Sequence, residues 1–336
     1  MSLILPEGYK SVLGIRDTER AIKVTRELFE RELSLRLNLE RASAPLFVLD
    51  GQGINDDLNG VERPVAFDIA AVKGANAQIV HSLAKWKRLV LGEYYCYSVG
   101  EGIYTNMNAI RRDEEPDNLH SIYVDQWDWE RVISKENRNE EFLKKIVKRI
   151  VDAICDVNKE LHHMYPELTH KIKRDVTFIT TEELLQKYPN LTAKERENAI
   201  TKECKTVFLM KIGDKLSDGT VHDGRAPDYD DWQLNGDILV WNEVLNCSFE
   251  ISSMGIRVSP ESLREQLKKS GHEERENLYY HKKLLNGELP YTIGGGIGQS
   301  RLCMLLLEKA HIGEVHASVW PQDMLDECKK HGMLIL

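Results

Sequence analysis

The sequence predicts an α+β protein in which an antiparallel β-sheet is flanked by helices. Two observations lead to this class. Alternating apolar segments follow one another without an intervening helix, most clearly over residues 236–258. Amphipathic stretches with helical spacing also occur before, between and after these segments, the first of them over 17–37. A regular alternation of strands and helices, which would indicate a parallel sheet, is not the pattern of this chain.

The first predicted helix, 17–37, has cap candidates at Asp17 and Thr18 and an apolar face that includes Ala21, Ile22 and Phe29. Further helices are predicted at 83–92, 138–162, 181–188, 193–203, 260–286 and 299–309. Alternating apolar segments predict strands at 63–69, 77–82, 102–110, 119–127, 176–180, 206–212, 236–242 and 249–258.

No stretch rich in Pro, Gly or Ser divides the chain, and we found no internal repeat. The 336 residues are enough for one large domain or two of ordinary size. We therefore predict a single domain over 1–336, with a helical insertion at about 134–205.

The composition is that of a soluble protein, with 42% hydrophobic and 29% charged residues. A net charge of −9 argues against broad nucleic-acid binding, which needs a basic surface. The six cysteines form no Cys-x-x-Cys pair, which indicates free thiols in a reducing compartment. The N-terminus has no signal-peptide pattern, and no segment approaches membrane-spanning length. We expect a cytoplasmic protein with no membrane or nucleic-acid partner.

The segment "YTIGGGIGQSR" (291–301) places four glycines in five positions directly before a predicted helix. Such clusters often bind phosphate, because backbone N–H groups and a helix N-terminus favour anions. The segment matches neither the P-loop nor the dinucleotide-binding pattern. Taken alone, it is better explained by close packing between a strand and a helix.

The segment "SIYVDQWDWER" (121–131), if extended, places Gln126, Asp128 and Glu130 on one face. Burying three polar groups is costly unless something satisfies them. A solvent-facing strand side and a binding site for an ammonium group are about equally consistent with this pattern.

Charged residues gather in three further segments. "RAPDYDDW" (225–232) is typical of a charged turn, but Asp237, Glu250 and Arg257 follow closely. Asp237 and Glu250 can hold Mg2+ through oxygen atoms, which suits a triphosphate substrate. "HSLAKWKR" (81–88) and "AIRRDEE" (109–115) add basic residues. We found no convincing nucleophilic side chain. This set of charged residues therefore suits a reaction in which one substrate directly attacks a phosphoryl-activated substrate.

Three segments resemble the motifs of class II aminoacyl-tRNA synthetases. "LNLERASAPLF" is similar to motif 1, which lies at the dimer interface of that class, and "AIRRDEE" is similar to motif 2. "TIGGGIGQSR" is similar to motif 3, whose final arginine stacks on adenine. The resemblance implies that Arg111 clamps the α-phosphate. Where motif 2 usually has its glutamate, this chain has Asp113, and Glu114 follows one position later. Either carboxylate can therefore be the one that faces the nucleotide.

Nine segments in order, among them "NDDLNG", "GEGIYTNM", "KLSDG" and "EISSMGIR", resemble one family, the ammonia-dependent asparagine synthetases (type A). The resemblance covers about residues 15–320. It implies an aspartate site formed by Asp56, Ser82, Lys87, Gln126, Asp128, Asp230 and Arg257. It implies a nucleotide site formed by Arg111, Asp113, Glu114, Arg225, Asp237, Glu250, Ser253, Gly295, Gly296 and Arg301. Within these sets it implies metal ligation by Asp237 and Glu250, and catalytic roles for Arg111, Lys87 and Asp230.

The implied reaction joins L-aspartate and ammonia at the expense of ATP, with Mg2+ as cofactor and β-aspartyl-AMP as intermediate, in a homodimer. Free ammonia is the expected nitrogen source, because Ser2 follows Met1 where glutamine-using synthetases have an N-terminal cysteine. Two alternative functions remain consistent with the sequence. One is an aspartyl- or asparaginyl-tRNA synthetase, and the other is a regulatory protein that kept the fold and lost the chemistry.

Overall fold

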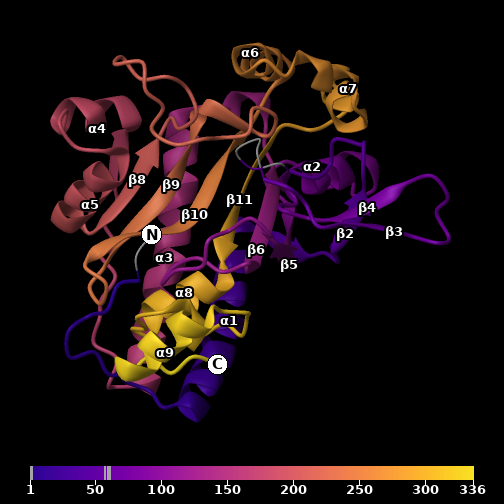
Figure 1. Ribbon diagram of the computed structural model, residues 1–336. Coiled ribbons are helices and arrows are strands. Elements are labelled where there is room, and N and C mark those ends of the chain that lie inside the picture. Colours follow the sequence, from indigo (N-terminus) through magenta and orange to yellow (C-terminus); the bar gives the residue numbers. More distant parts are fainter. Residues whose placement is uncertain (1–2, 57, 59–61) are drawn as a thin grey trace.

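The protein is described by a computed structural model covering residues 3–56, 58 and 62–336. An eight-stranded sheet in the order β1-β5-β6-β11-β10-β9-β8-β7 runs through its centre (Figure 1). The six central strands pair antiparallel with one another, and only the edge pairs β1–β5 and β7–β8 are parallel. The predicted α+β class with an antiparallel sheet is confirmed.

The strands of the large sheet are β1 (Leu39–Arg41), β5 (Gly102–Ile110), β6 (Tyr123–Val132), β7 (Thr177–Thr180), β8 (Thr206–Met210), β9 (Asp230–Asn242), β10 (Cys247–Arg257) and β11 (Thr292–Gly298). A second sheet, at the right of Figure 1, has the order β2-β4-β3 and comprises β2 (Phe47–Leu49), β3 (Ala66–Asp68) and β4 (Asn76–Ile79).

The α-helices are α1 (Ile15–Leu37), α2 (Ala84–Glu93), α3 (Glu140–Met164), α4 (Thr181–Lys187), α5 (Ala193–Cys204), α6 (Pro260–Ser270), α7 (Tyr279–Leu285), α8 (Gln299–Leu306) and α9 (Gln322–Lys330). Short 3-10 turns lie at Lys135–Asn137, Glu273–Asn277 and Ile312–Glu314. Thr180, Thr192 and Ser259 each form a capping box, which fixes the first turns of α4, α5 and α6.

The two faces of the large sheet have different roles. Trp127 and Trp129 of β6 are fully buried in the main hydrophobic core, together with apolar residues of α1, α3 and α8. Phe29 of α1 packs on Trp127 with ring centroids 4.8 Å apart. The alternate residues of β6 point to the opposite face, where α2 lies. One face therefore forms the core, and the other can carry polar groups.

Three predicted elements differ from the structure. The predicted helix 260–286 is interrupted, because Gly271 ends α6 in the left-handed conformation with φ 73°. The strand predicted at 119–127 begins only at Tyr123, because Asp117 accepts hydrogen bonds from the backbone N–H groups of residues 119 and 120 and forms a turn. Third, the glycine segment, which is absent from the predicted strands, is strand β11 in the middle of the sheet.

Residues 134–205 contribute α3, the edge strand β7 and the helices α4 and α5. The single domain and its helical insertion stay predictions. Residues 57 and 59–61 of the "NDDLNG" segment lie outside the described residues. Within the described part of the chain, we find no helix that is both long enough and apolar enough to span a bilayer.

Candidate active site

A polar cavity of about 380 Å³ lies on the face of the large sheet that is opposite the main hydrophobic core. Its walls come from β6, β10 and β11 and from the segments around residues 56, 82, 111–126 and 223–230. Most of the predicted site residues line it: Asp56, Ser82, Arg111, Glu114, Gln126, Asp128, Arg225, Asp230, Glu250, Ser253, Arg257, Gly295, Gly296 and Arg301. Lys87, Asp113 and Asp237 are not among the lining residues.

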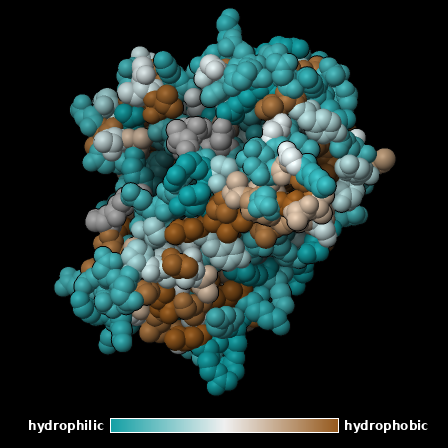
Figure 2. All heavy atoms as spheres, turned by 45° about the vertical axis from the view of Figure 1, so that its right-hand side comes forward, coloured by the Kyte–Doolittle hydropathy of each residue, from teal (hydrophilic) through white to brown (hydrophobic). Residues whose placement is uncertain are grey.

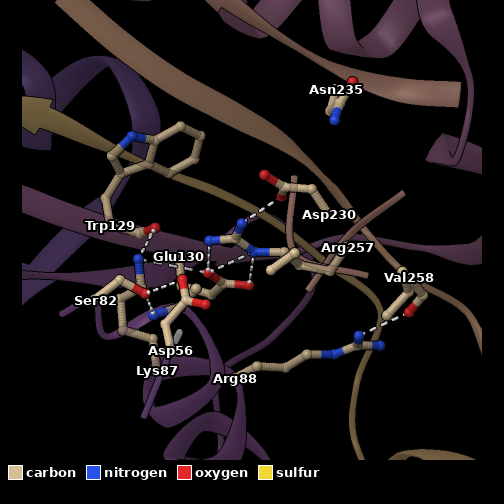
Figure 3. A network of polar contacts seen from close by, with 12 residues as sticks. Asp56, Ser82, Lys87, Arg88, Trp129, Glu130, Asp230, Asn235, Arg257 and Val258 are labelled. Carbon is tan, nitrogen blue, oxygen red and sulfur yellow. Dashed lines mark hydrogen bonds and ion pairs between the residues drawn. The ribbon is translucent and has the colours of Figure 1, made fainter. Parts of the chain in front are cut away.

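Arg257 of β10 is the centre of a buried ion-pair network (Figure 3). Its Nε and Nη2 atoms donate to Glu130 at 3.0 and 2.7 Å, and its Nη1 atom donates to Asp230 at 2.5 Å. Burial alone would lower the pKa of Arg257, but these two carboxylates raise it well above its ordinary value. Arg257 is therefore a fixed cation whose guanidinium borders the cavity.

Lys87 of α2 lies behind Asp128 and is fully buried. Its ammonium group pairs with Asp128, donates to the carbonyl of Trp129 at 2.9 Å, and lies 3.7 Å from Glu130. Burial lowers the pKa of Lys87 even though both carboxylates oppose this shift. The resemblance implies that Lys87 belongs to the aspartate site. In the structure Lys87 does not line the cavity, and its ammonium group contacts Asp128, Trp129 and Glu130.

Asp56 and Ser82 form a second edge of the cavity, close to the Lys87 network in Figure 3. The Ser82 hydroxyl donates to Asp56 at 3.1 Å, and the second carboxylate oxygen of Asp56 accepts from the backbone N–H of Leu58 at 3.0 Å. The backbone N–H of Leu83 donates to Asp128 at 3.1 Å. Hydrogen bonds from the residues just before α2 thus hold Asp56 and Asp128 at the same wall of the cavity.

The glycines of β11 make room for these side chains. A Cβ atom on Gly294 would lie 2.1 Å from Glu130 Oε2, and one on Gly296 would lie 2.3 Å from Gln126 Oε1. Both distances are far below van der Waals contact, because the β6 side chains pass over the bare backbone of β11. The glycines therefore shape the part of the cavity region that holds the side chains of Glu130 and Gln126.

The two acidic candidates of motif 2 lie differently. Asp113 pairs with Arg63 through Nε at 3.0 Å and also accepts from its backbone N–H. Glu114 lines the cavity, as does Arg111. The Nε atom of Arg111 is buried without a hydrogen-bond partner among the described residues, which suits an anionic ligand. Of the two carboxylates, therefore, Glu114 lies at the cavity and Asp113 does not line it.

Asp237 and Glu250 lie on the neighbouring strands β9 and β10. Glu250 lines the cavity, and Asp237 pairs with Arg225, which also lines it. Burial raises the pKa of Asp237 to about 8, although Arg225 opposes the shift. One oxygen of Asp237 is buried without a hydrogen-bond partner among the described residues. A carboxylate with an unsatisfied buried oxygen fits a cation, so this pair is compatible with Mg2+.

A scan with protein-family models matches residues 16–332 to the aspartate–ammonia ligase model. The chain is 61% identical over its full length to an aspartate–ammonia ligase of Lactobacillus johnsonii, with all of both chains covered. It is 60% identical to one of Clostridium tetani, which covers 99% of this chain and 98% of the relative. The chain belongs to the aspartate–ammonia ligase family.

The solved structures to which this aspartate–ammonia ligase family member is similar include asparaginyl-tRNA synthetases. Asparaginyl-tRNA synthetase of Pyrococcus horikoshii, complexed with asparaginyl-adenylate, superposes with a TM-score of 0.63 at 15% identity, over 91% of this chain and 70% of that one. The Entamoeba histolytica enzyme gives 0.63 at 13% identity and covers 90% of this chain. This chain spans 66% of the length of the Entamoeba chain. The likeness shows the fold, and it confirms the predicted class II synthetase-like architecture.

Sequence reasoning missed the role of Glu130 in this ligase family member. The alternation of β6 placed it on the face of Gln126 and Asp128, so the signal was present, but we gave it no function. The "RAPDYDDW" segment also differs from an ordinary charged turn, because Asp228, Asp230 and Asp231 are all buried. Their partners come from distant segments, including Arg257 for Asp230 and Arg138 for Asp231.

Proposed function

We propose that the protein makes L-asparagine from L-aspartate and ammonia in two steps. The β-carboxylate of aspartate attacks the α-phosphorus of ATP, which gives β-aspartyl-AMP and pyrophosphate. Ammonia then attacks the activated carbonyl carbon and releases AMP. The observation that carries this proposal is one cavity that brings buried carboxylates beside Arg257 at one end and Arg111, Glu114 and Arg301 at the other. No nucleophilic side chain is required, so catalysis rests on positioning and electrostatics.

At the aspartate end, Asp128, Asp230 and Gln126 are proposed to accept hydrogen bonds from the substrate ammonium group. Burial raises the pKa of Asp230, whereas Arg257 opposes that shift. Arg257 supplies the positive charge for a substrate carboxylate. Lys87 supports this end indirectly, because it fixes Asp128 and Glu130.

At the nucleotide end, Arg111 is proposed to bind the α-phosphate, and Arg301 to lie on adenine. Arg301 lines the cavity, and its Nη1 donates to the carbonyl of Glu250 at 3.1 Å, which orients the guanidinium. Ser253, Arg225 and the backbone at Gly295 and Gly296 complete this end. A fixed cation beside the α-phosphate stabilises the charge that develops there during attack.

Mg2+ is the proposed cofactor, held by Asp237 and Glu250 together with substrate phosphates. Two protein carboxylates are enough, because Mg2+ usually keeps several waters and bridges phosphate oxygens. We find no cluster of three or more metal-ligating side chains among the described residues. When bound, the ion would offset part of the negative charge of the triphosphate.

We further propose a cytoplasmic homodimer. Large apolar side chains are exposed on or near α1 and β2: Ile15, Leu35, Leu46 and Phe47. Figure 2 shows hydrophobic residues gathered across the middle and lower part of one face, between hydrophilic regions. Exposed apolar surface of this kind is typical of protein interfaces. All six cysteines are free, as in proteins of a reducing compartment.

The test is to incubate the protein with ATP, Mg2+, aspartate and ammonium, and to measure asparagine and AMP. Aspartate-dependent exchange of pyrophosphate into ATP, without ammonium, reports the first step alone. We expect both activities, and neither should need tRNA. Absence of exchange would refute the adenylate step, whereas transfer of aspartate to tRNA would favour a synthetase.

A further inference from the structure

A second cavity, of about 250 Å³, adjoins the first and is not used by the aspartate or nucleotide contacts above. It lies between the segment 49–56, strand β4, Lys85 of α2, and α7 with the 3-10 turn before it. Asp56 lines both cavities. This carboxylate therefore stands at the boundary between them, next to the end of the first cavity that we assign to aspartate.

The inner wall of the second cavity holds Asp228, which is fully buried. One of its oxygens accepts from Lys85 Nζ at 3.2 Å and from Arg275 Nη1 at 3.2 Å. Burial opposes ionisation, but these cations and His281 hold the pKa of Asp228 well below its ordinary value. Asp228 therefore remains an anion and a permanent hydrogen-bond acceptor.

Two buried polar atoms of this wall have no hydrogen-bond partner among the described residues. The second oxygen of Asp228 has none among the described residues, and the same holds for Nδ1 of His281. His281 is also fully buried, lines the cavity, and points its Nε2 to Asp228 at 3.0 Å. Buried polar groups are nearly always satisfied, so two open atoms on one cavity wall indicate a small hydrogen-bonding ligand.

The open carboxylate oxygen of the cavity wall indicates which ligand this is. Asp228 contacts Lys85, Arg275 and His281 through one oxygen, and its other oxygen can only accept hydrogen bonds. The ligand must therefore carry hydrogen-bond donors, and Asp50 and Asp56 add two further carboxylates to the lining. Of the three substrates, only ammonium is both small and a donor at every position.

We infer that the second cavity binds ammonium at Asp228 and delivers it past Asp56 to the aspartyl end of the first cavity. The inference rests on the proposed function. A separate opening matters because the bound adenylate fills the first cavity at the moment when nitrogen must enter. Ammonium can then approach the activated carbonyl without displacing the nucleotide.

The chemistry balances with the groups present. Ammonium gives one proton to the Asp56 carboxylate and becomes ammonia, whose lone pair attacks the carbonyl carbon of β-aspartyl-AMP. The new C–N bond forms, the C–O bond to AMP breaks, and AMP leaves with that electron pair. The nitrogen then loses a second proton by the same route, and both protons pass to solvent through the second cavity.

Two variants test the inference. Leu49→Trp narrows the cavity, because Leu49 lines it. Asp228→Asn removes the charge that holds ammonium. Losing a charge-assisted hydrogen bond predicts that the KM for ammonium rises about tenfold or more, while the KM for aspartate changes by less than about twofold. Hydroxylamine, a larger nucleophile, should be penalised by Leu49→Trp more than ammonium is.

The matched control is Val72→Trp, because Val72 is also an aliphatic residue but is exposed and lies outside the lining. It should keep the ammonium KM of the unmodified protein. If Leu49→Trp does not fold, the milder Leu49→Phe replaces it. An unchanged ammonium KM in the folded variants overturns the inference, and so does an equal rise in the KM values of ammonium and aspartate. Absence of pyrophosphate exchange in the unmodified protein would instead refute the proposed function, on which the inference rests.

Discussion

Arg257 and Glu130 form a buried ion pair across two strands that are not neighbours in the sheet. Strand β11 lies between them, and the pair forms over the bare backbone of Gly294. Both side chains are almost completely removed from solvent. Arg257 and the two carboxylates near Lys87, Asp128 and Glu130, are therefore held in one geometry before any substrate enters. This geometry fixes where a substrate carboxylate can bind.

Replacing Glu130 by Gln should destabilise the protein and weaken aspartate binding. The substitution leaves Arg257 with Asp230 alone and removes one counter-charge of Lys87. Breaking a buried ion pair by neutralising one partner costs about 3–5 kcal/mol. Urea unfolding and the KM for aspartate measure the two effects. Glu141→Gln, on an exposed position of α3, is the control, and wild-type stability of Glu130→Gln would contradict the positioning role.

Gly296→Ala should impair aspartate use by displacing Gln126. The added methyl group cannot fit 2.3 Å from the Gln126 carbonyl oxygen, so that side chain must rotate away. We expect a higher KM for aspartate and a smaller effect on ATP binding, measured by steady-state kinetics. Gly14→Ala is the control, since nothing lies within 4 Å of the added atom there. Normal aspartate kinetics in Gly296→Ala would show that Gln126 does not contact the substrate.

Much of this site followed from local patterns in the sequence. Alternation along β6 correctly placed Gln126, Asp128 and Glu130 on one face, because side-chain direction in a strand depends only on local geometry. The apolar face of 17–37 was also sufficient to predict α1. These predictions needed no knowledge of distant segments.

Other features depend on contacts far apart in the chain. Nothing around Lys87 indicates that its ammonium group is fully buried, because its partners come from β6, about forty residues later. The glycine segment was absent from the predicted strands for the same reason. Its strand conformation is stabilised by pairing with β6 and β10, and the space it leaves is filled by side chains from those strands.

Acid should destabilise the protein partly through His311. Burial lowers the pKa of His311 from 6.5 to about 4, and its Nε2 has no hydrogen-bond partner among the described residues. The unfolded chain therefore binds this proton first, so the stabilising contribution is complete above pH 6.5 and is lost as the pH falls toward 4. The loss amounts to at most about 3 kcal/mol.

The measurement is urea unfolding of His311→Asn between pH 7 and 4. Asparagine keeps an acceptor for the backbone N–H of Gly313, which His311 Nδ1 now accepts at 3.0 Å, but it does not titrate. The variant should lose less stability on acidification than the unmodified protein. His163→Asn, at an exposed position, should titrate like the unmodified protein. Identical pH profiles for all three proteins would exclude His311 as a source of acid sensitivity.

Arg301→Lys should weaken ATP binding although it preserves the charge. Arg301 lines the cavity from the first turn of α8, and its side chain is 23% exposed, so it is neither freely solvated nor deeply buried. Lysine has no planar face to lay on adenine and cannot reproduce the directional donor to the Glu250 carbonyl. Losing a cation–π contact in a partly desolvated site costs on the order of 1–2 kcal/mol, roughly a tenfold weakening.

Titration calorimetry with ATP and thermal unfolding, carried out on the same preparation, separate the two roles that Arg301 can have. A stacking role predicts weaker ATP binding with an unchanged melting temperature, because among the described residues no buried ion pair depends on this side chain. A purely surface role predicts that both quantities stay the same, as expected for the control Arg264→Lys on an exposed position of α6. A lower melting temperature with intact ATP affinity would instead assign Arg301 to holding α8 against β10 through Glu250.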